Sequence, residues 1–356
     1  MPSRRLFLLG SIALAAPVRA AIDFPVVTPR SLVFPRDHGA HPEFRTEWWY
    51  LTGWLDVPGG NSLGFQVTFF RTRTDVDPAN PSAFAARQLV IAHAALADPS
   101  RGSLLHDERI GRSGFEVVGA FEADTDLRLG PWRFAREPGG AYHGTLPARG
   151  FDLEFTARPT QPLLLQGDGG FSRKGPSSAQ ASYYYSQPHL EVRARLTRDG
   201  KAQQLAGRGW LDHEWSSTLL APDAAGWDWV GMNLDDGSAL TAFQIRQQST
   251  GQPMYAYASL RDPQGGTRFF KPDQVRFGRQ AEWTSPRTRA TWSVSQQLSV
   301  GERTFVTRPL MNDQELDSRM STGAVYWEGA SELIEGGRRV GRGYLEMTGY
   351  VAPIRL

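Results

Sequence analysis

The stretch Ala92-His93-Ala94-Ala95-Leu96-Ala97-Asp98-Pro99 decides the fold, because its pattern returns downstream as Ala256-Tyr257-Ala258-Ser259-Leu260-Arg261-Asp262-Pro263. Working outward, Phe65-Gln66-Val67 precedes the first copy as Phe243-Gln244-Ile245 precedes the second. A further match follows each copy in the same order. Such self-similarity indicates two copies of one structural unit, and we place the seam between them near Gln187.

The repeated unit is built from β-strands. Hydrophobic and polar residues alternate with a period of two in residues 63–69, 151–155 and 190–194, and turns rich in Gly, Pro and Asp separate these runs. No convincing ten-residue helical stripe occurs, although residues 311–319 suit a short helix. The pattern predicts an all-β fold of two tandem antiparallel barrels, residues 22–187 and 188–356, of a size that can enclose a ligand.

Composition removes several functional classes. The 356 residues contain no Cys, which excludes thiolate nucleophiles, Cys-ligated metals and disulfides. The 39 Lys+Arg balance 37 Asp+Glu without a basic block, so we expect no nucleic-acid partner. The 11 Trp, 10 Tyr and 19 Phe instead suggest the walls of a site for a lipophilic molecule.

The N-terminus has the features of an export signal. Arg4 and Arg5 precede an apolar run too short to span a bilayer, and Val18-Arg19-Ala20 offers a cleavage site. We interpret residues 1–21 as a twin-arginine-type signal peptide, with a Sec signal as the alternative. The mature protein is then expected to be periplasmic or secreted.

The first chemically interesting cluster runs from His38 through His41 and Glu47 into Trp48-Trp49-Tyr50. Its His and Glu residues are metal-ligand types, but a Gly and a Pro make this segment a loop whose spacing fixes little, so we predict no metal. Glu47 stands on an apolar wall. It is either paired with an arginine for structure or held with a raised pKa for proton transfer.

The second cluster lies within Gly209-Trp210-Leu211-Asp212-His213-Glu214-Trp215. In a strand, His213 and Trp215 point one way while Asp212 and Glu214 point the other. His213 and Trp215 together can position a polar group beside an apolar ligand. The alternative is a structural His213, satisfied by Asp212 or by a neighbouring strand.

Two more clusters embed acids among aromatic residues. Asp228 lies between Trp227 and Trp229, and Glu328 follows Tyr326-Trp327. Asp235 belongs to an Asp-Asp-Gly turn signal. The repeated association predicts an aromatic-lined cavity with buried acids, and the alternative is a Trp-rich core with Arg–carboxylate pairs.

Known catalytic motifs are otherwise absent. Gly60-Asn61-Ser62-Leu63-Gly64 matches the nucleophile-elbow pattern, but a β run follows it instead of a helix. The sequence has no P-loop, dinucleotide fingerprint, His-Glu-x-x-His or EF-hand loop, so no cofactor is predicted.

Taken together, these motifs resemble the carotenoid 1,2-hydratase (hydroxyneurosporene synthase) and AttH-like family, in particular its exported branch of predicted secreted hydrolases. The resemblance rests on motifs spread over nearly the whole mature chain: Glu47-Trp48-Trp49-Tyr50, Tyr183-Tyr184-Tyr185-Ser186, Gly209 to Trp215, Trp227-Asp228-Trp229, Leu234-Asp235-Asp236-Gly237, Tyr326-Trp327-Glu328-Gly329 and Gly343 to Tyr350. It implies two lipocalin-like barrels in tandem.

The resemblance also implies a chemistry. The hydratase branch protonates the terminal double bond of an acyclic carotenoid, and water then attacks the cation. His213 and Trp215 match its His-x-Trp pair. Asp235 falls near its Tyr-x-Asp pair, but Asn233 stands where Tyr is expected. The chain is therefore closer to the exported branch, whose substrate the resemblance does not supply.

These observations lead to one functional hypothesis and two alternatives. We expect an exported, monomeric protein that hydrates or hydrolyses an isoprenoid- or lipid-like molecule by acid catalysis; the alternatives are a non-catalytic binder of lipophilic molecules and an accessory protein of a membrane transporter. The predicted catalytic residues are His213, Trp215, Asp235, Asp228 and Glu47. The predicted ligand-binding residues are Trp48, Trp49, Tyr50, Tyr185, Trp227, Trp229, Tyr326, Trp327 and Glu328.

Overall fold

A computed structural model describes residues 23–77 and 79–355 of the chain. The predicted signal peptide lies outside the described residues. Only strands and two short 3-10 helices, η1 (Arg36–His38) and η2 (Pro272–Gln274), occur in the described part. No helix there is long and apolar enough to cross a membrane. The expected short helix within residues 311–319 is wrong, because part of that segment pairs as strand β21 (Glu315–Ser318).

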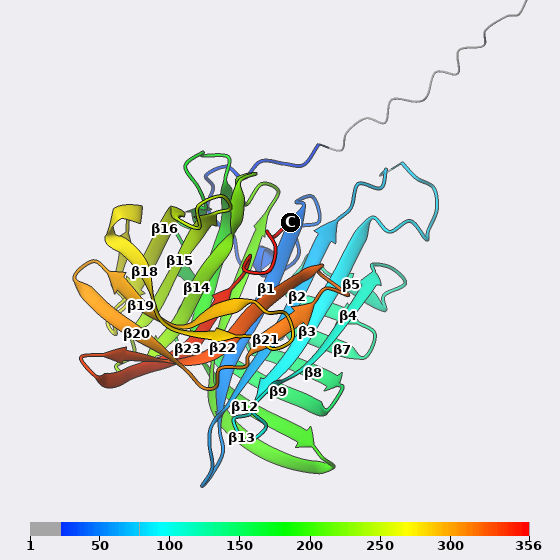
Figure 1. Ribbon diagram of the computed structural model, residues 1–356. Helices are drawn as coiled ribbons and strands as arrows, with labels where there is room; N and C mark the ends of the chain where they lie inside the picture. The colour runs from blue at the N-terminus through cyan, green and yellow to red at the C-terminus, as the bar shows by residue number, and fades with distance from the viewer. Residues whose placement is uncertain (1–22, 78, 356) are drawn as a thin grey trace, which may run out of the picture.

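The first sheet contains 13 antiparallel strands in the order β4-β3-β2-β1-β13-β12-β9-β8-β7-β6-β5, with β10 and β11 added to β12 (Figure 1). Its two ends, β4 and β5, are consecutive in the chain and lie close together, so the sheet is a nearly closed barrel. The strands are β1 (Thr46–Asp56), β2 (Leu63–Arg73), β3 (Gln88–Ala97), β4 (Leu104–Arg112), β5 (Val118–Ala120), β6 (Asp126–Leu129), β7 (Trp132–Arg136), β8 (Tyr142–Ala148), β9 (Phe151–Pro159), β10 (Leu164–Leu165), β11 (Phe171–Arg173), β12 (Ala181–Arg198) and β13 (Lys201–Ser216).

The second sheet contains ten antiparallel strands in the order β17-β16-β15-β14-β23-β22-β20-β19-β18, with β21 added to β22. It curls back so that its end strands are joined through η2. The other strands are β14 (Ala224–Leu234), β15 (Ala239–Gln247), β16 (Pro253–Arg261), β17 (Thr267–Phe270), β18 (Val275–Thr284), β19 (Thr291–Val300), β20 (Arg303–Pro309), β22 (Ala324–Glu335) and β23 (Arg338–Met347). Two curled antiparallel sheets confirm the all-β prediction.

The two copies of the repeated pattern occupy equivalent strands. The first copy lies on β3 beside β2, and the second lies on β16 beside β15. The predicted seam at Gln187, however, falls inside β12, where the pairing with β13 is irregular. Strands β12 and β13 complete the first barrel by pairing with β9 and β1, so the chain changes sheet only between Ser216 and Ala224.

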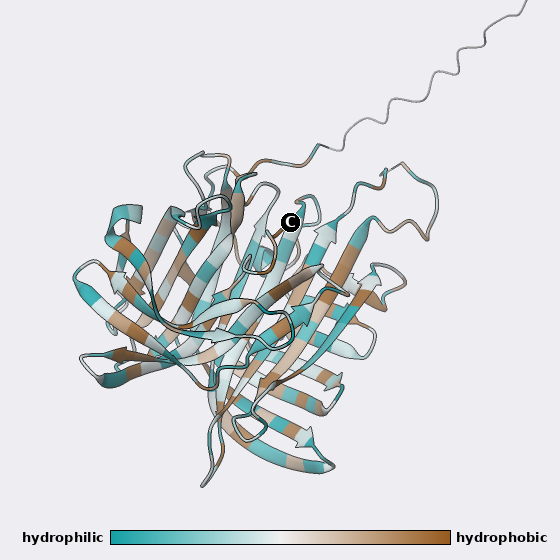
Figure 2. Cartoon of the chain, in the orientation of Figure 1, coloured by the Kyte–Doolittle hydropathy of each residue, from teal (hydrophilic) through white to brown (hydrophobic). Residues whose placement is uncertain are grey.

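The three largest clusters of buried apolar side chains mark the interiors of the molecule. One cluster fills each barrel, and a third lies between the sheets, where Trp54 and Trp210 of the first meet Trp229, Phe243 and Tyr344 of the second. Strands with one face in water keep the expected alternation: β9 is buried at every second residue, and Figure 2 shows teal and brown bands along the strands at lower right. Strands β1 and β14 and residues 209–216 of β13 are instead buried on both faces, because a barrel core covers one face and the other sheet covers the opposite face.

Candidate active site

A cavity lies between the two sheets, where β1, β2 and β13 of the first face β14, β15, β22 and β23 of the second. Its volume is about 80 Å³, which suits a few water molecules or the reacting part of a larger ligand. The lining combines aromatic and aliphatic side chains with four carboxyl groups and one amine: Trp48, Tyr50, Thr68, Phe70, Lys174, Asp212, Glu214, Leu219, Trp227, Trp229, Phe243, Ile245, Glu328 and Glu346.

Strand β13 separates this cavity from the interior of the first barrel. Asp212 and Glu214 face the cavity, whereas His213 and Trp215 are fully buried on the opposite face. The predicted division of these side chains between two faces is therefore confirmed. The cavity side carries the acids, and the barrel side carries the His-x-Trp pair.

Asp212 is the best-connected acid of the cavity. Its Oδ1 is 2.5 Å from Ser186 Oγ and 2.8 Å from Trp210 Nε1, and its Oδ2 is 2.7 Å from the Tyr184 hydroxyl. Burial raises the pKa of Asp212 to about 7, although these hydrogen bonds act in the opposite direction. The nearby Glu214 raises the pKa further. At neutral pH this carboxyl group can therefore both give and take a proton.

Glu328 and Glu346 form a second acidic group on the opposite wall. They stand directly across from each other on β22 and β23, and the Tyr50 hydroxyl donates a hydrogen bond to Glu328. Burial raises the pKa of Glu346 to about 8, and burial together with the charge of Glu346 raises the pKa of Glu328 well above its ordinary value. Two neighbouring carboxyl groups in an apolar cavity resist ionising together, so this pair keeps a proton at neutral pH.

The single amine of the cavity belongs to Lys174, which directly follows β11. Its Nζ lies 3.0 Å from Glu214 Oε1 and within 4.4 Å and 4.1 Å of the centres of the Tyr184 and Phe243 rings. Only 5% of this residue is exposed. Burial lowers the pKa of Lys174, and the Glu214 carboxylate limits that shift.

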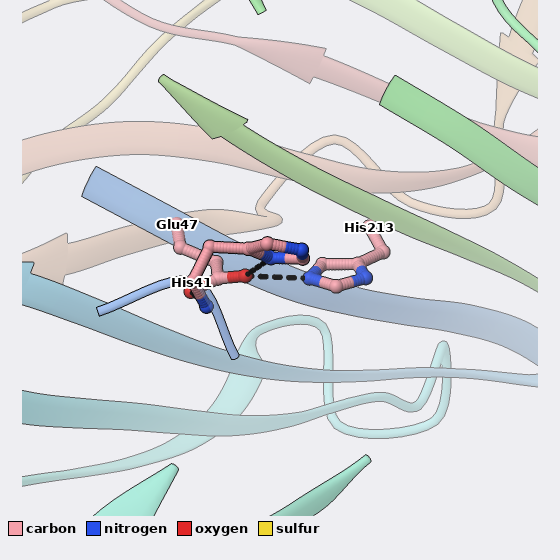
Figure 3. A group of neighbouring side chains, drawn as sticks. All are labelled: His41, Glu47 and His213. Carbon is pink, nitrogen blue, oxygen red and sulfur yellow. Dashed lines mark hydrogen bonds and ion pairs between the residues drawn. The ribbon is translucent and has the colours of Figure 1, made fainter. Parts of the chain in front are cut away.

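A separate buried network surrounds Glu47 inside the first barrel (Figure 3). Glu47 Oε1 is 2.7 Å from His41 Nδ1 and 2.9 Å from His213 Nε2, and its Oε2 accepts hydrogen bonds from Arg71 Nε and from the His41 backbone N–H, both at 2.8 Å. The far nitrogens of the imidazoles are also occupied. His41 Nε2 is 3.0 Å from Asp37 Oδ1, and His213 Nδ1 is 3.1 Å from the Tyr185 hydroxyl.

The charges in this network balance as ion pairs. Burial alone would lower the pKa of His41, but Glu47 and Asp37 outweigh it and raise the pKa. Burial lowers the pKa of His213 to about 4, which keeps that ring neutral. Burial works to raise the pKa of Glu47, but His41 and Arg71 hold it well below its ordinary value. His41 is thus an imidazolium between two carboxylates, and its ring stacks on Trp215 at 3.8 Å.

The same three groups, His41, Glu47 and His213, bring metal-ligand atoms within 4.8 Å of one another. Both nitrogen–oxygen distances to Glu47 are hydrogen-bond distances, and Arg71 already supplies a positive charge to the carboxylate. These three side chains therefore fit a network of hydrogen bonds and ion pairs better than a metal-binding site.

The remaining predicted site residues are distributed over several places. Trp48, Tyr50, Trp227, Trp229 and Glu328 line the cavity. Four of the others are buried aromatic residues outside the cavity: Trp49 stacks on His213, Tyr185 hydrogen-bonds to His38 and His213, Tyr326 hydrogen-bonds to His93, and Trp327 lies in the second barrel core. Asp228 is also buried elsewhere, in contact with Gln244, Arg246 and Tyr350. Asp235 lies at a turn, 3.4 Å from Arg339.

Sequence reasoning did not place Asp212, Glu214, Glu346 or Lys174 among the site residues. The first three belong to the aromatic clusters that predicted the cavity, so the signal was present but did not show which face of the strand borders it. Lys174 lies in a loop and has no local signal beyond its rarity, since the chain contains only three lysines.

Comparison with known proteins now identifies the family. A sequence model described as AttH-like matches residues 25–350. The chain belongs to the AttH-like family. A crystal structure described as an AttH of Nitrosomonas europaea is 52% identical, with a TM-score of 0.86 over 92% of this chain and 99% of that one. The resemblance to AttH-like proteins seen in the sequence is thereby confirmed.

More distant structures share the fold. Kievitone hydratase from Nectria haematococca is 14% identical, with a TM-score of 0.68 over 92% of this chain and 94% of that one. CghA in complex with Sch210972 is 15% identical, with a TM-score of 0.55 over 94% of this chain and 97% of that one. No sequence among functionally curated proteins matches the chain.

Proposed function

We propose that this AttH-like protein adds water to a hydrophobic, isoprenoid- or lipid-like molecule by acid catalysis in the cavity between its sheets. The observation that carries the proposal is a set of carboxyl groups with raised pKa values in a cavity walled by aromatic rings: the Glu328–Glu346 pair, which keeps a proton at neutral pH, and Asp212, whose pKa is about 7. A carboxylic acid held neutral in an apolar site is the form required to protonate a weakly basic substrate.

The proposed reaction has two steps. The Glu328–Glu346 pair gives a proton to a carbon of the double bond, and the faces of the surrounding Trp residues stabilise the carbocation that results. A water molecule then attacks the cation, and Asp212, whose pKa lies near 7, takes the proton that the water loses. Proton exchange with solvent restores the acid pair.

The predicted catalytic roles of His213, Trp215, Asp228, Asp235 and Glu47 stay predictions. In the proposed mechanism Glu47 and His213 are positioning residues, because their hydrogen bond joins β1 to β13. The opposite faces of these two strands present Tyr50 and Asp212 to the cavity.

The name of kievitone hydratase describes the same class of reaction and supports the proposal at the level of shared architecture. A non-catalytic binder would use the same aromatic walls but would have no need for neutral acids. The role as an accessory protein of a transporter stays a prediction.

The proposal is tested with protein purified from its own cellular compartment. Native mass spectrometry and solvent extraction would identify a bound lipophilic molecule, and chromatography would follow its conversion by fresh enzyme. We expect turnover by the wild type and by Glu154→Gln, a change on an exposed position of β9, and a loss of about 10²- to 10⁴-fold in Glu346→Gln and Asp212→Asn. Binding of the molecule without turnover by the wild type would establish a binder instead.

We also propose that the protein is exported, on the evidence of residues 1–21. Cell fractionation should find the wild type outside the cytoplasm, whereas Arg4→Lys with Arg5→Lys should retain it inside if the twin-arginine route is used. Export of this double variant at the normal level would point to the Sec route.

A further inference from the structure

Lys174 is the one lysine that the fold places inside the protein. The other two, Lys201 and Lys271, are exposed. The Lys174 amine reaches the cavity from the loop between β11 and β12, whose backbone is closed by a 2.7 Å hydrogen bond from Lys174 N–H to Gln180 O. An exposed lysine could also neutralise a carboxylate, so the burial of Lys174 requires a chemical explanation.

The surroundings of the amine are those of a nucleophile. Two aromatic rings, Tyr184 and Phe243, lie against Nζ and exclude water from it. The Glu214 carboxylate, 3.0 Å away, can accept a proton from the ammonium group. Asp212 lines the same cavity and supplies a second acid–base group. A desolvated amine beside a carboxylate is the arrangement that activates lysine toward carbonyl compounds.

We propose that Lys174 forms a Schiff base with a hydrophobic aldehyde or ketone in this cavity. The ligand class follows from the walls, which are aromatic and aliphatic around the amine, and from the absence of a second cation among the lining residues. This inference rests on the cavity of the proposed function, and it adds that the ligand, or a precursor of it, carries a carbonyl group.

The reaction balances with groups that line the cavity. Glu214 takes one proton from the Lys174 ammonium, and the free amine attacks the carbonyl carbon to form a carbinolamine. Glu214 returns the proton to the hydroxyl group, which leaves as water while the carbon–nitrogen double bond forms. In the adduct, one proton moves from the attacking nitrogen to the former carbonyl oxygen before water leaves. The product is a protonated imine, so the positive charge beside Glu214 is the same at the end of the reaction as at the start.

Two further features favour this reaction at Lys174. The lowered pKa of its amine increases the fraction of free amine at neutral pH over that of an exposed lysine. If the carbonyl is conjugated to a double bond, the protonated imine also draws electrons from that bond, which makes its far carbon more reactive toward water.

The test uses the whole mature protein, decanal or citral as the probe, and cyanoborohydride to reduce any imine at pH 7. Intact mass and peptide mapping then report which amines carry the reduced adduct. We expect labelling of Lys174 to exceed that of Lys201 or Lys271 by about tenfold or more. Equal labelling of the three lysines, or no labelling of Lys174, would overturn the inference.

Matched variants separate chemistry from folding. Lys174→Arg keeps the charge beside Glu214 and should lose the specific adduct, whereas Lys201→Arg should keep it. If Lys174→Arg does not fold, a competition experiment on the wild type replaces it. Decanol has the same alkyl chain as decanal but no carbonyl group, so saturating decanol should protect Lys174 from labelling by decanal. Labelling that is unchanged by decanol would contradict binding in the cavity. Labelling is also measured in Glu346→Gln, where a retained adduct with lost hydration would separate this inference from the proposed function.

Discussion

Replacing Glu47 by Gln should destabilise the protein severely, because this side chain is the centre of a buried charge network. Glu47 has no exposed surface and accepts four hydrogen bonds, two from His41 and one each from Arg71 and His213. The amide that replaces the carboxylate has only one acceptor atom and no charge. Arg71 and the His41 imidazolium would then be buried with too little compensation.

The magnitude follows from that unpaired charge. Removing one partner of a buried ion pair costs about 3–5 kcal/mol, and full burial of Glu47 leaves no solvent to screen the loss. With an unfolding entropy of about 2 cal/mol/K per residue, a chain of this size should lose about 4–7 °C in melting temperature.

The assay is urea unfolding followed by circular dichroism, with Glu282→Gln as the matched control. Glu282 pairs with Arg279 at 3.0 Å on the surface, and both side chains are largely exposed, so this change should cost less than about 1 kcal/mol. A Glu47→Gln variant as stable as the Glu282→Gln variant would refute the assignment of Glu47 as the buried counter-charge of this network.

Three further predictions follow from particular residues. Because the pKa of Asp212 is raised in the folded state to about 7 from 3.8, the contribution of this group to stability should fall as pH rises between these values. Asp212→Asn should remove that contribution, seen as a difference from the wild type in unfolding curves recorded across this range. The raised pKa of His41 gives stability that is complete below about pH 6.5 and is lost as pH rises through its folded value; a ring that NMR titration finds neutral below pH 6.5 would contradict this. Gly64→Ala should cost about 1–3 kcal/mol, because the added methyl group would lie 2.5 Å from Ala330 of the other sheet, whereas Gly139→Ala, with open space around it, should be nearly neutral in the same unfolding assay.

Much of the architecture could be predicted from alternation and repetition. The β period and the two copies of the Ala92 pattern predicted two antiparallel β units, and both copies occupy equivalent strands. The seam was harder to place because β12 and β13 carry the same alternation as the strands of either barrel. Which sheet they join is decided by their pairing with β9 and β1, which no local pattern records.

The sequence predicted the type of site, an aromatic-lined cavity with buried acids, but only some of the residues that line it. Aromatic clusters with embedded acids predicted a cavity, and Tyr50, Trp229 and Glu328 do line one. The alternation along β13 predicted two faces for its acids and its His-x-Trp pair. It could not show which face borders the cavity, because β1 and residues 209–216 of β13 are buried on both sides and the usual contrast between a solvent-exposed and a buried face is lost.

The most direct test of acid-catalysed hydration is isotope incorporation from solvent. The lipophilic molecule extracted from the purified protein would be incubated with fresh enzyme in water enriched in both ¹⁸O and deuterium, and the product analysed by mass spectrometry. The proposed mechanism predicts one ¹⁸O and one carbon-bound deuterium per molecule converted, at a rate that falls by about 10²- to 10⁴-fold in Glu346→Gln. A product without solvent oxygen on carbon, or equal rates in the wild type and Glu346→Gln, would contradict it.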